Sequence, residues 1–248
     1  IPYVTSYYKD YWGFCLSEKE KRSLPPGKYK IVIDSELKEG FLDYSSAFIK
    51  GNSEKQILFS SYICHPSMAN NELSGPIVIN GILDYIKKQY PNPKYSYRFV
   101  LVPETIGSII YINKNEADLK RNLICGFNLS CVGDERSFSF VQTPYNDTLS
   151  DNALRAALIG KNNVKEFSYL DRGSDERQYC SPGIDLPVCT FSRSKFFVFP
   201  EYHTSADNLN LISEKGLKDS LEVMKSIVDS FEISLEPKCK IKCEPQLG

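Results

Sequence analysis

The feature that most constrains this chain is a regular alternation, from residue 56 onward, of short apolar runs with amphipathic segments. The run QILFSSYI (56–63) predicts a buried strand, and residues 74–90 follow it with apolar side chains at helical spacing. The same criteria predict strands at 97–103, 122–132, 137–142 and 186–191, and helices from Ile106, over 149–159 and after Ser213. This alternation predicts an α/β fold, with a mixed, mainly parallel central sheet and helices on both faces.

The first part of the chain has a different pattern, rich in aromatic residues and short β-branched runs. KYKIVID (28–34) and GFLDYSSAFIKG (40–51) are predicted strands, and a Pro-Pro-Gly turn precedes them. We therefore expect a small β-rich subdomain over residues 1–51, followed by an α/β domain over residues 52–236.

Composition excludes several functional classes. The chain has 248 residues, 42% hydrophobic and 25% charged, with a formal net charge of -1 and no basic cluster, so neither nucleic acid nor an anionic membrane is an expected partner. No run approaches the roughly 20 apolar residues that span a bilayer. The chain begins without Met, so the lack of a secretory signal at its start carries little weight.

Most of the eight cysteines lie in strand-like apolar contexts, as Cys125 and Cys189 do. They are predicted to be small, reduced, buried residues, which favours a cytoplasmic location. Cys239 and Cys243 lie in a Lys-rich tail. Two thiols alone make a poor zinc site, so we expect exposed tail cysteines there.

The only two histidines of the chain, His65 and His203, each fall in a loop just after an apolar or aromatic run. In open α/β sheets, ligands bind at the carboxyl ends of strands, which is where these loops are expected. Each histidine has polar neighbours, in CHPSMANNE and PEYHTSADN. Metal binding or acid–base chemistry at a shared site and two separate structural histidines are both compatible with this pattern.

Two further polar clusters lie at predicted strand ends. Glu104 directly follows the strand at 97–103, where it could act as a general base or simply favour the start of the next helix. The loop at 169–187 holds Asp175, Glu176 and Arg177 beside a glycine. This loop could bind a charged end of a substrate, or its charges could pair with one another in solvent.

Four segments resemble, in this order, the motifs of a bacterial aminopeptidase-like family that is often labelled as polysaccharide-biosynthesis proteins: CHPSMANNELSG, PETIGS, GSDERQYCSPGIDLPV and FPEYHTSADN. That family is similar in fold to the zinc-dependent exopeptidases of the aminopeptidase Y and bacterial leucyl aminopeptidase type. The opening IPYVTSYYKDYWGFCLS resembles the small β subdomain inserted in that family. The closing KCEPQLG resembles its junction to a C-terminal winged-helix domain, so residues 237–248 are expected to be a tail leading to that domain.

The resemblance implies roles for the strand-end residues. His65 and His203 match the two metal-binding histidines, and Glu104 matches the catalytic base. Thr105 stands where the glutamate of the second metal is expected, and Ser130 stands where the aspartate of the first metal is expected. Two carboxylate ligands of the usual two-zinc centre are therefore missing.

The aspartate that bridges the two metals would fall at Asn71, and its neighbour is Glu72. An amide oxygen is a neutral, weak zinc ligand and cannot balance the charge of two divalent ions. Glu72 would need a local rearrangement to compensate. One zinc ion is therefore favoured over two, and a metal-free site is also open.

The resemblance implies a zinc-dependent hydrolase of amide bonds, with a possible link to surface polysaccharide synthesis. Asp175 or Glu176 would bind a substrate amino group, Arg177 would meet a carboxylate or sugar acid, and Tyr202 would line the substrate site. The expected ligand is a small peptide, an aminoacyl compound or an amino sugar. The alternatives are a catalytically degenerate fold that binds a ligand or partner, and a purely structural module. The oligomeric state does not follow from the sequence.

Overall fold

The structure is a computed structural model that describes residues 13–34, 36 and 38–234. Its strands are β1 (Ser45–Ile49), β2 (Gln56–Tyr62), β3 (Ser96–Val102), β4 (Leu123–Leu129), β5 (Phe138–Val141), β6 (Val164–Phe167) and β7 (Val188–Ser192). Its α-helices are α1 (Glu18–Ser23), α2 (Ser74–Gln89), α3 (Ile106–Asn122), α4 (Leu149–Ala157), α5 (Glu176–Tyr179) and α6 (Glu214–Ile233). A π-helical turn covers Ala69–Leu73 and a 3-10 turn covers Tyr169–Asp171.

The strands form one seven-stranded sheet in the order β1-β3-β2-β4-β7-β5-β6. The β2–β3, β2–β4, β4–β7 and β5–β6 pairs are parallel, whereas β1–β3 and β5–β7 are antiparallel. Because the four parallel pairs outnumber the two antiparallel ones, the predicted mixed, mainly parallel sheet is confirmed.

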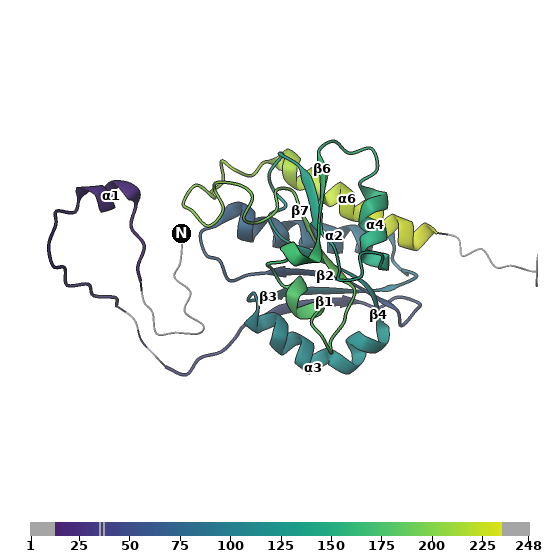
Figure 1. The fold of residues 1–248 in the computed structure, drawn as a ribbon. Helices are drawn as coiled ribbons and strands as arrows, with labels where there is room; N and C mark the ends of the chain where they lie inside the picture. Colours follow the sequence, from purple (N-terminus) through teal and green to yellow (C-terminus); the bar gives the residue numbers. More distant parts are fainter. Residues whose placement is uncertain (1–12, 35, 37, 235–248) are drawn as a thin grey trace, which may run out of the picture.

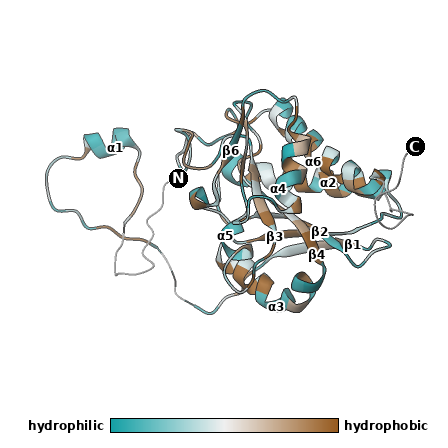
Figure 2. Ribbon diagram, turned by 45° about the vertical axis from the view of Figure 1, so that its right-hand side comes forward, coloured by the Kyte–Doolittle hydropathy of each residue, from teal (hydrophilic) through white to brown (hydrophobic). Residues whose placement is uncertain are grey.

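Helices cover both faces of the sheet (Figure 1). In β2, side chains alternate between the two faces, as a strand requires. Ile57 and Phe59 belong to the core that α2, α4 and α6 cover, and Leu58 belongs to the core under α3 and α5. Every residue of β2 is buried, so this strand lies at the centre of the molecule, and the apolar strands run through the middle of Figure 2.

Local sequence signals fix several helix starts. The Ser213 side chain accepts a hydrogen bond from the backbone N–H of Gly216 at the start of α6, and Thr148 forms a capping box with Asp151 at the start of α4. Gly75, in the first turn of α2, lies so close to β2 that an added Cβ would be 2.1 Å from the Ser61 Oγ. Only glycine lets α2 begin directly against the carboxyl ends of the strands.

The structure differs from the strands predicted in the N-terminal part of the chain. Residues 28–34 form no strand, because in the described part before β1 the backbone has no strand partner and its side chains are exposed. The strand expected over 40–51 is shortened to β1, which pairs with β3 at the edge of the main sheet. The β-rich subdomain over 1–51 stays a prediction, because residues 1–12 lie outside the described residues. In Figure 1 the segment that carries α1 extends away from the sheet.

Other differences concern lengths and locations. The helix from Ile106 is 17 residues long, longer than expected, and the short elements β6 and α5 were not predicted. Cys125, Cys131, Cys180 and Cys189 are buried and free as expected, whereas Cys15 and Cys64 are exposed. Cys239, Cys243 and most of the predicted tail lie outside the described residues. None of the helices described here combines the length and apolar character needed to cross a membrane.

Candidate functional site

The two histidines meet at the carboxyl end of the sheet. His65 follows β2, and His203 lies in the long connection between β7 and α6. Their ring centroids are 5.3 Å apart, although 138 positions separate them in the chain (203 minus 65). The parallel pairing of β2, β4 and β7 brings these loops to one edge, so the two imidazoles lie side by side there.

Glu104 lies on the same site. Its carboxylate Oε2 is 3.8 Å from the His65 Nε2, and its side chain is 19% exposed. The backbone N–H of Glu104 donates a hydrogen bond to the Cys64 Sγ, which ties the loop after β3 to the loop after β2. The residue predicted as the base therefore faces the first imidazole.

The other side of His65 is held by Glu72. The Glu72 Oε2 accepts a hydrogen bond of 2.6 Å from the backbone N–H of His65 and lies 3.6 Å from its Nδ1. The same nitrogen is 3.3 Å from the Cys64 Sγ. Glu72 thus orients the loop and the imidazole, which is a role the adjacency of Asn71 and Glu72 in the sequence does not reveal.

Burial and charge drive the pKa values of the two imidazoles apart. Burial would lower the pKa of His65, but hydrogen bonds that its imidazole donates to Cys64 and Glu72, and the charges of Cys64 and Glu104, outweigh it and raise that pKa to about 10. Burial and repulsion by His65 lower the pKa of His203 to about 4. Near neutral pH, the pair therefore holds one positive charge, on His65.

The pKa values of two carboxyl groups near this charge are raised. Burial raises the pKa of Glu104, although the charge of His65 and a hydrogen bond with Ser174 oppose this. Burial and the neighbouring charge of Glu104 raise the pKa of Asp175 to about 7. Titratable groups with opposed shifts at one site are typical of acid–base chemistry.

Asn71 lies in the π-helical turn just before α2. The Asp207 carboxylate accepts hydrogen bonds from three successive backbone N–H groups of this turn, those of Ala69, Asn70 and Asn71, at 3.1, 2.6 and 2.9 Å. Asp207 is completely buried. Because Asp207 follows His203 by four residues, this contact fixes the second histidine loop on the first.

The side chain of Asn71 is already engaged within the protein. Its Oδ1 accepts hydrogen bonds from the Tyr62 hydroxyl at 2.8 Å and from the Cys131 thiol at 3.3 Å. The Tyr62 hydroxyl also lies 2.7 Å from the Ser130 Oγ. Two positions expected to carry metal-binding carboxylates, 71 and 130, are thus joined by one buried phenol.

Thr105, the third position where the resemblance expects a carboxylate ligand, is engaged by charged groups. The Thr105 hydroxyl accepts a hydrogen bond of 2.8 Å from the Arg177 Nη2, and the Thr105 backbone N–H donates to Asp175. Within the described residues, no group of three or more His, Cys, Asp or Glu side chains is arranged to hold a metal ion. The donors present do not fit the two-zinc centre that the resemblance implies, because amide and hydroxyl groups stand where its charged ligands are expected.

The predicted substrate-binding loop is mostly bonded to itself. The Glu176 Oε1 accepts from the backbone N–H groups of Gly173 and Ser174, and its Oε2 accepts from the Thr190 hydroxyl. Arg177 also donates from its Nε to the Ser174 carbonyl. Both Glu176 and Arg177 therefore shape the loop in this structure.

Asp175 differs from its neighbours in the loop. It is completely buried, and its Oδ1 accepts hydrogen bonds from the Thr105 N–H and the Ser108 hydroxyl, each at 2.8 Å. Its Oδ2 is buried without a hydrogen-bond partner among the residues that the structure describes. A buried carboxylate oxygen with an open bonding position beside Glu104 suits the binding of a positively charged amino group.

Tyr202 stacks directly on the second histidine, with 4.0 Å between the ring centroids and 14° between the ring planes. Phe197 and Phe199 pack edge-on against Tyr202, at 4.9 and 5.5 Å. Tyr202 is thus placed beside the imidazole pair, where it fixes the orientation of the His203 ring.

Backbone strain concentrates in the loops around this site. Four residues other than glycine have positive φ there: Ser67, Thr105, Cys131 and His203, at 67°, 66°, 55° and 55°. Such conformations cost energy and are kept where the surrounding structure enforces them, commonly at functional sites.

Tyr62 and Asp207 are the site residues that the sequence interpretation missed. A polar aromatic residue at the end of an otherwise apolar strand, and an aspartate four positions after a strand-end histidine, were the available signals. Neither is distinctive alone, because buried tyrosines and loop aspartates are common.

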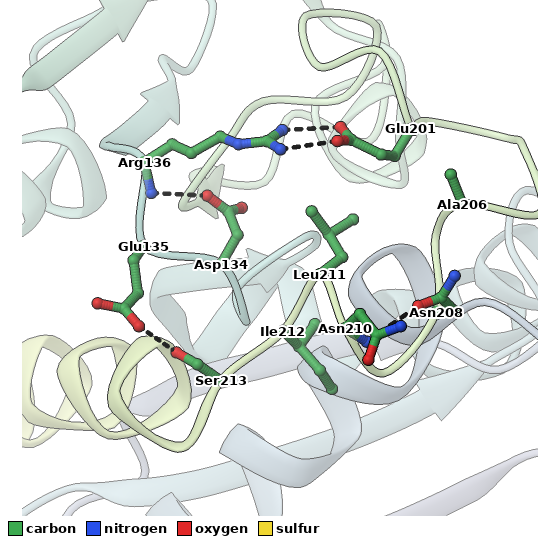
Figure 3. A pocket seen from close by; sticks show the side chains of 10 residues that line it. All are labelled: Asp134, Glu135, Arg136, Glu201, Ala206, Asn208, Asn210, Leu211, Ile212 and Ser213. Atoms are coloured by element: carbon green, nitrogen blue, oxygen red, sulfur yellow. Dashed lines mark hydrogen bonds and ion pairs between the residues drawn. The ribbon is translucent and has the colours of Figure 1, made fainter.

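A cavity of about 440 Å³ is lined by the β4–β5 loop at Asp134, Glu135 and Arg136 and by residues of the connection between β7 and α6 (Figure 3). Along its edge, both guanidinium Nη atoms of Arg136 donate to the Glu201 carboxylate at 2.8 Å, and Ser213 donates to Glu135 at 2.6 Å. The Arg136–Glu201 pair holds the connection that carries Tyr202 and His203 against the β4–β5 loop.

Comparison with known proteins places this geometry in context. The family described as "Domain of unknown function (DUF4910)" matches residues 12–234. A curated Clostridium acetobutylicum protein is 42% identical over 256 residues, which cover 100% of this chain and 57% of that protein. Its name proposes that it is a polysaccharide biosynthesis protein with an aminopeptidase-like domain.

Solved structures agree with this assignment of the fold. The crystal structure of a protein from Clostridium acetobutylicum, proposed to be a peptidase, has a TM-score of 0.87 and 40% identity, covering 100% of this chain and 58% of that one. A zinc aminopeptidase from Bacillus subtilis has a TM-score of 0.63 and 21% identity, covering 75% of this chain and 49% of the other. The chain has an aminopeptidase-like fold and spans little more than half the length of its near relatives.

Proposed function

This chain belongs to the family described as "Domain of unknown function (DUF4910)", and we propose that it is an aminopeptidase-like hydrolase of amide bonds in small amino-bearing molecules. The observation that carries this proposal is the placement of the Glu104 carboxylate 3.8 Å from the Nε2 of His65, beside His203. The fold neighbours that are aminopeptidases support the same reaction class.

The residues have complementary roles in this proposal. Glu104 is partly buried with a raised pKa, which suits a base that takes a proton from water near neutral pH. The charged imidazole of His65 donates to negative charge that develops on the substrate carbonyl oxygen. The open Oδ2 of Asp175 receives the substrate amino group. No step is assigned to a metal ion, because the donor set does not fit the two-zinc centre.

The proposed substrates are small peptides, aminoacyl compounds and amino sugars. Each of these carries the positive amino group that the buried carboxylates would recognise. The name of the Clostridium acetobutylicum relative supports a place in the synthesis of surface polysaccharides. The buried free thiols of Cys125, Cys131, Cys180 and Cys189 support action in a reducing compartment, the cytoplasm.

Glu104→Gln is the central test. With a panel of aminoacyl and amino-sugar amides, we expect the variant to lose about a hundredfold or more in turnover, because an amide cannot accept the proton of water. Glu116→Gln is the matched control, since Glu116 lies on the exposed face of α3 in an ion pair with Lys120. Unchanged turnover in Glu104→Gln would show that the base is assigned wrongly.

Zinc is tested separately. Elemental analysis of protein purified without chelator measures whether one ion is bound, and the same assays with added zinc measure whether activity depends on it. We expect Asn71→Asp to bind zinc more tightly than the natural sequence, because it restores a charged oxygen ligand. Equal zinc affinity in both proteins would argue that position 71 lies outside any metal site.

A second candidate function is ligand binding without turnover. The bonds that join Tyr62, Asn71 and Ser130 favour it, since they occupy positions where the resemblance expects metal ligands. In this case, the wild type hydrolyses none of the panel with or without zinc, yet an amino-bearing compound raises its melting temperature. Asp175→Asn would abolish that shift.

A further inference from the structure

A second cavity, of about 260 Å³, lies between the end of β6 and the first part of the connection after β7. Its polar lining contains three basic residues and no acidic residue: Arg136, Ser137, Asn163, Lys165, Ser194 and Lys195. An apolar wall formed by Phe167, Val198, Phe199 and Pro200 completes it. A small cavity with this lining has the charge and the hydrogen-bond donors of an anion site.

Lys195 is the most unusual of these residues. It is only 7% exposed, although lysine is rarely buried without a paired charge. Its ammonium nitrogen lies over three aromatic rings, at 4.3 Å from the centroid of Phe196, 5.3 Å from that of Phe167 and 5.8 Å from that of Phe197. Because Lys195 and Phe167 both line the cavity, this caged ammonium lies at its wall.

The protein itself supplies little to balance this charge. In the described part of the chain, the Lys195 ammonium makes one long hydrogen bond, 3.4 Å to the Phe196 carbonyl, and no ion pair with a carboxylate. The aromatic faces attract the cation but leave N–H donors unused, because a lysine ammonium has three. Burial lowers the pKa of Lys195, as expected for a charge whose hydration is only partly replaced.

The other two cations differ in their availability. Arg136 is engaged by the two hydrogen bonds to Glu201, so most of its charge is neutralised. Lys165 is exposed on β6 and makes no ion pair with any described residue. Two ammonium groups that make no ion pair with a described residue thus line a cavity that also offers hydroxyl and amide groups from Ser137, Ser194 and Asn163.

We propose that this cavity, between β6 and residues 194–200, binds the oxyanion of a small polar molecule, such as a phosphorylated or carboxylated sugar. Lys195 and Lys165 contact the anion, and the apolar wall with Asn163 contacts the rest of the molecule. The size of the cavity suits a single small unit better than a nucleotide. The site is distinct from the imidazole pair and does not depend on the hydrolytic function.

The anion site is nevertheless mechanically close to the imidazoles. Phe197, one of the rings around the Lys195 ammonium, packs edge-on against Tyr202 at 4.9 Å, and Tyr202 stacks on His203. An anion bound by Lys195 therefore contacts the same connection between β7 and α6 that carries His203.

Calorimetric titration of the chain in a phosphate-free buffer tests the site with three probes: inorganic phosphate, glucuronate and uncharged glucose. We expect both anions to bind and glucose not to bind. Lys195→Met should weaken anion binding about tenfold or more, because a charge-assisted contact is lost while side-chain volume is kept. Lys165→Ala should weaken it severalfold, since its ammonium is more exposed.

Lys88→Met is the matched control, because Lys88 is an exposed lysine near the end of α2 and does not line the cavity. It should leave anion binding unchanged. If Lys195→Met does not fold, Lys165→Ala alone decides, as its side chain is exposed. Tighter binding of glucuronate than of phosphate supports a sugar acid, and the reverse supports a phosphate ester. The proposal is overturned if neither anion binds at millimolar concentration, if glucose binds equally well, or if both lysine variants bind like the wild type.

Discussion

The two halves of the candidate site contrast in how completely the protein satisfies its own polar groups. On the half around Asn71, the side chains of Tyr62, Ser130 and Asn71 bond to one another and are buried. On the half around His65, charged groups face one another at 3.6 to 3.8 Å, and a carboxylate oxygen of Asp175 lies unpaired among the described residues. We call the first the closed half, because its polar side chains pair with one another. We call the second the open half, because a buried carboxylate oxygen there has no hydrogen-bond partner among the described residues.

This difference shows that the electrostatics of one half do not depend on the hydrogen bonds of the other. Asn71 and Ser130, two positions where the resemblance expects charged ligands, are joined through the Tyr62 hydroxyl by short bonds between neutral groups. The pKa shifts on the other half persist, because they arise from burial and from Glu72, Glu104 and His65, none of which depends on Asn71. Substitutions can show whether the bonds of the closed half stabilise the fold, and whether the buried charge of the open half destabilises it.

Asp207→Ala should have the largest effect on the closed half. It removes the buried acceptor of three backbone N–H groups, so we expect the free energy of unfolding to fall by about 3–5 kcal/mol. Denaturant unfolding measures this. Asp84→Ala, in an exposed helical ion pair, is the control and should cost less than about 0.5 kcal/mol. A similarly small cost for Asp207→Ala would contradict the view that Asp207 fixes this turn.

On the open half, Asp175→Asn should have the opposite effect and raise the free energy of unfolding at high pH. Burial raises the pKa of Asp175 to about 7, so its folded pKa lies above its unfolded value of 3.8. The stability associated with its proton is present below pH 3.8 and is lost as the pH rises through about 7. The amide variant has no proton to lose, so above about pH 8 it should be more stable than the wild type by roughly 2–4 kcal/mol.

The pH dependence of this stability difference separates the effect of Asp175 ionisation from other effects of the substitution. Unfolding curves of Asp175→Asn and wild type should coincide near pH 4 and diverge as the pH rises. Asp84→Asn is the control, because its exposed side chain should give no such divergence. Equal stabilities at all pH values would mean that Asp175 is already ionised without cost, and that the open half is not strained.

The sequence predicted the strands and loops that form the site better than the bonds between its side chains. Apolar runs marked β2, β3, β4 and β7, and strand ends marked both histidines, because burial and topology act over whole segments. The run 28–34 has strand-like composition but lacks a partner in the described structure, and pairing decides whether such a run becomes a strand. The four-residue β6 is mostly exposed, so its apolar pattern is too weak to detect.

The bonds inside the site could not be predicted, because they depend on strand register. The Tyr62 hydroxyl meets the Ser130 side chain only because β2 and β4 are adjacent and parallel, with Ser60 opposite Asn128. A shift of one residue would turn either side chain to the other face of the sheet. The resemblance drew attention to Asn71 and Ser130, and the structure shows that the Tyr62 hydroxyl joins them.

Tyr62→Phe tests this joint directly and should have the smallest of the three effects. The change removes one hydroxyl that bonds to both Asn71 and Ser130, and we expect a loss of about 1–2 kcal/mol in the free energy of unfolding. Tyr179→Phe is a matched control on the opposite face of the sheet, since Tyr179 is also completely buried but its hydroxyl contacts only the Ser60 Oγ. Because one partner is left unpaired in the control and two in the test, Tyr62→Phe should cost more. If Tyr62→Phe costs no more than Tyr179→Phe, the closed half is held by packing alone, and the neutral bonds that replace the lost ligands have no structural role.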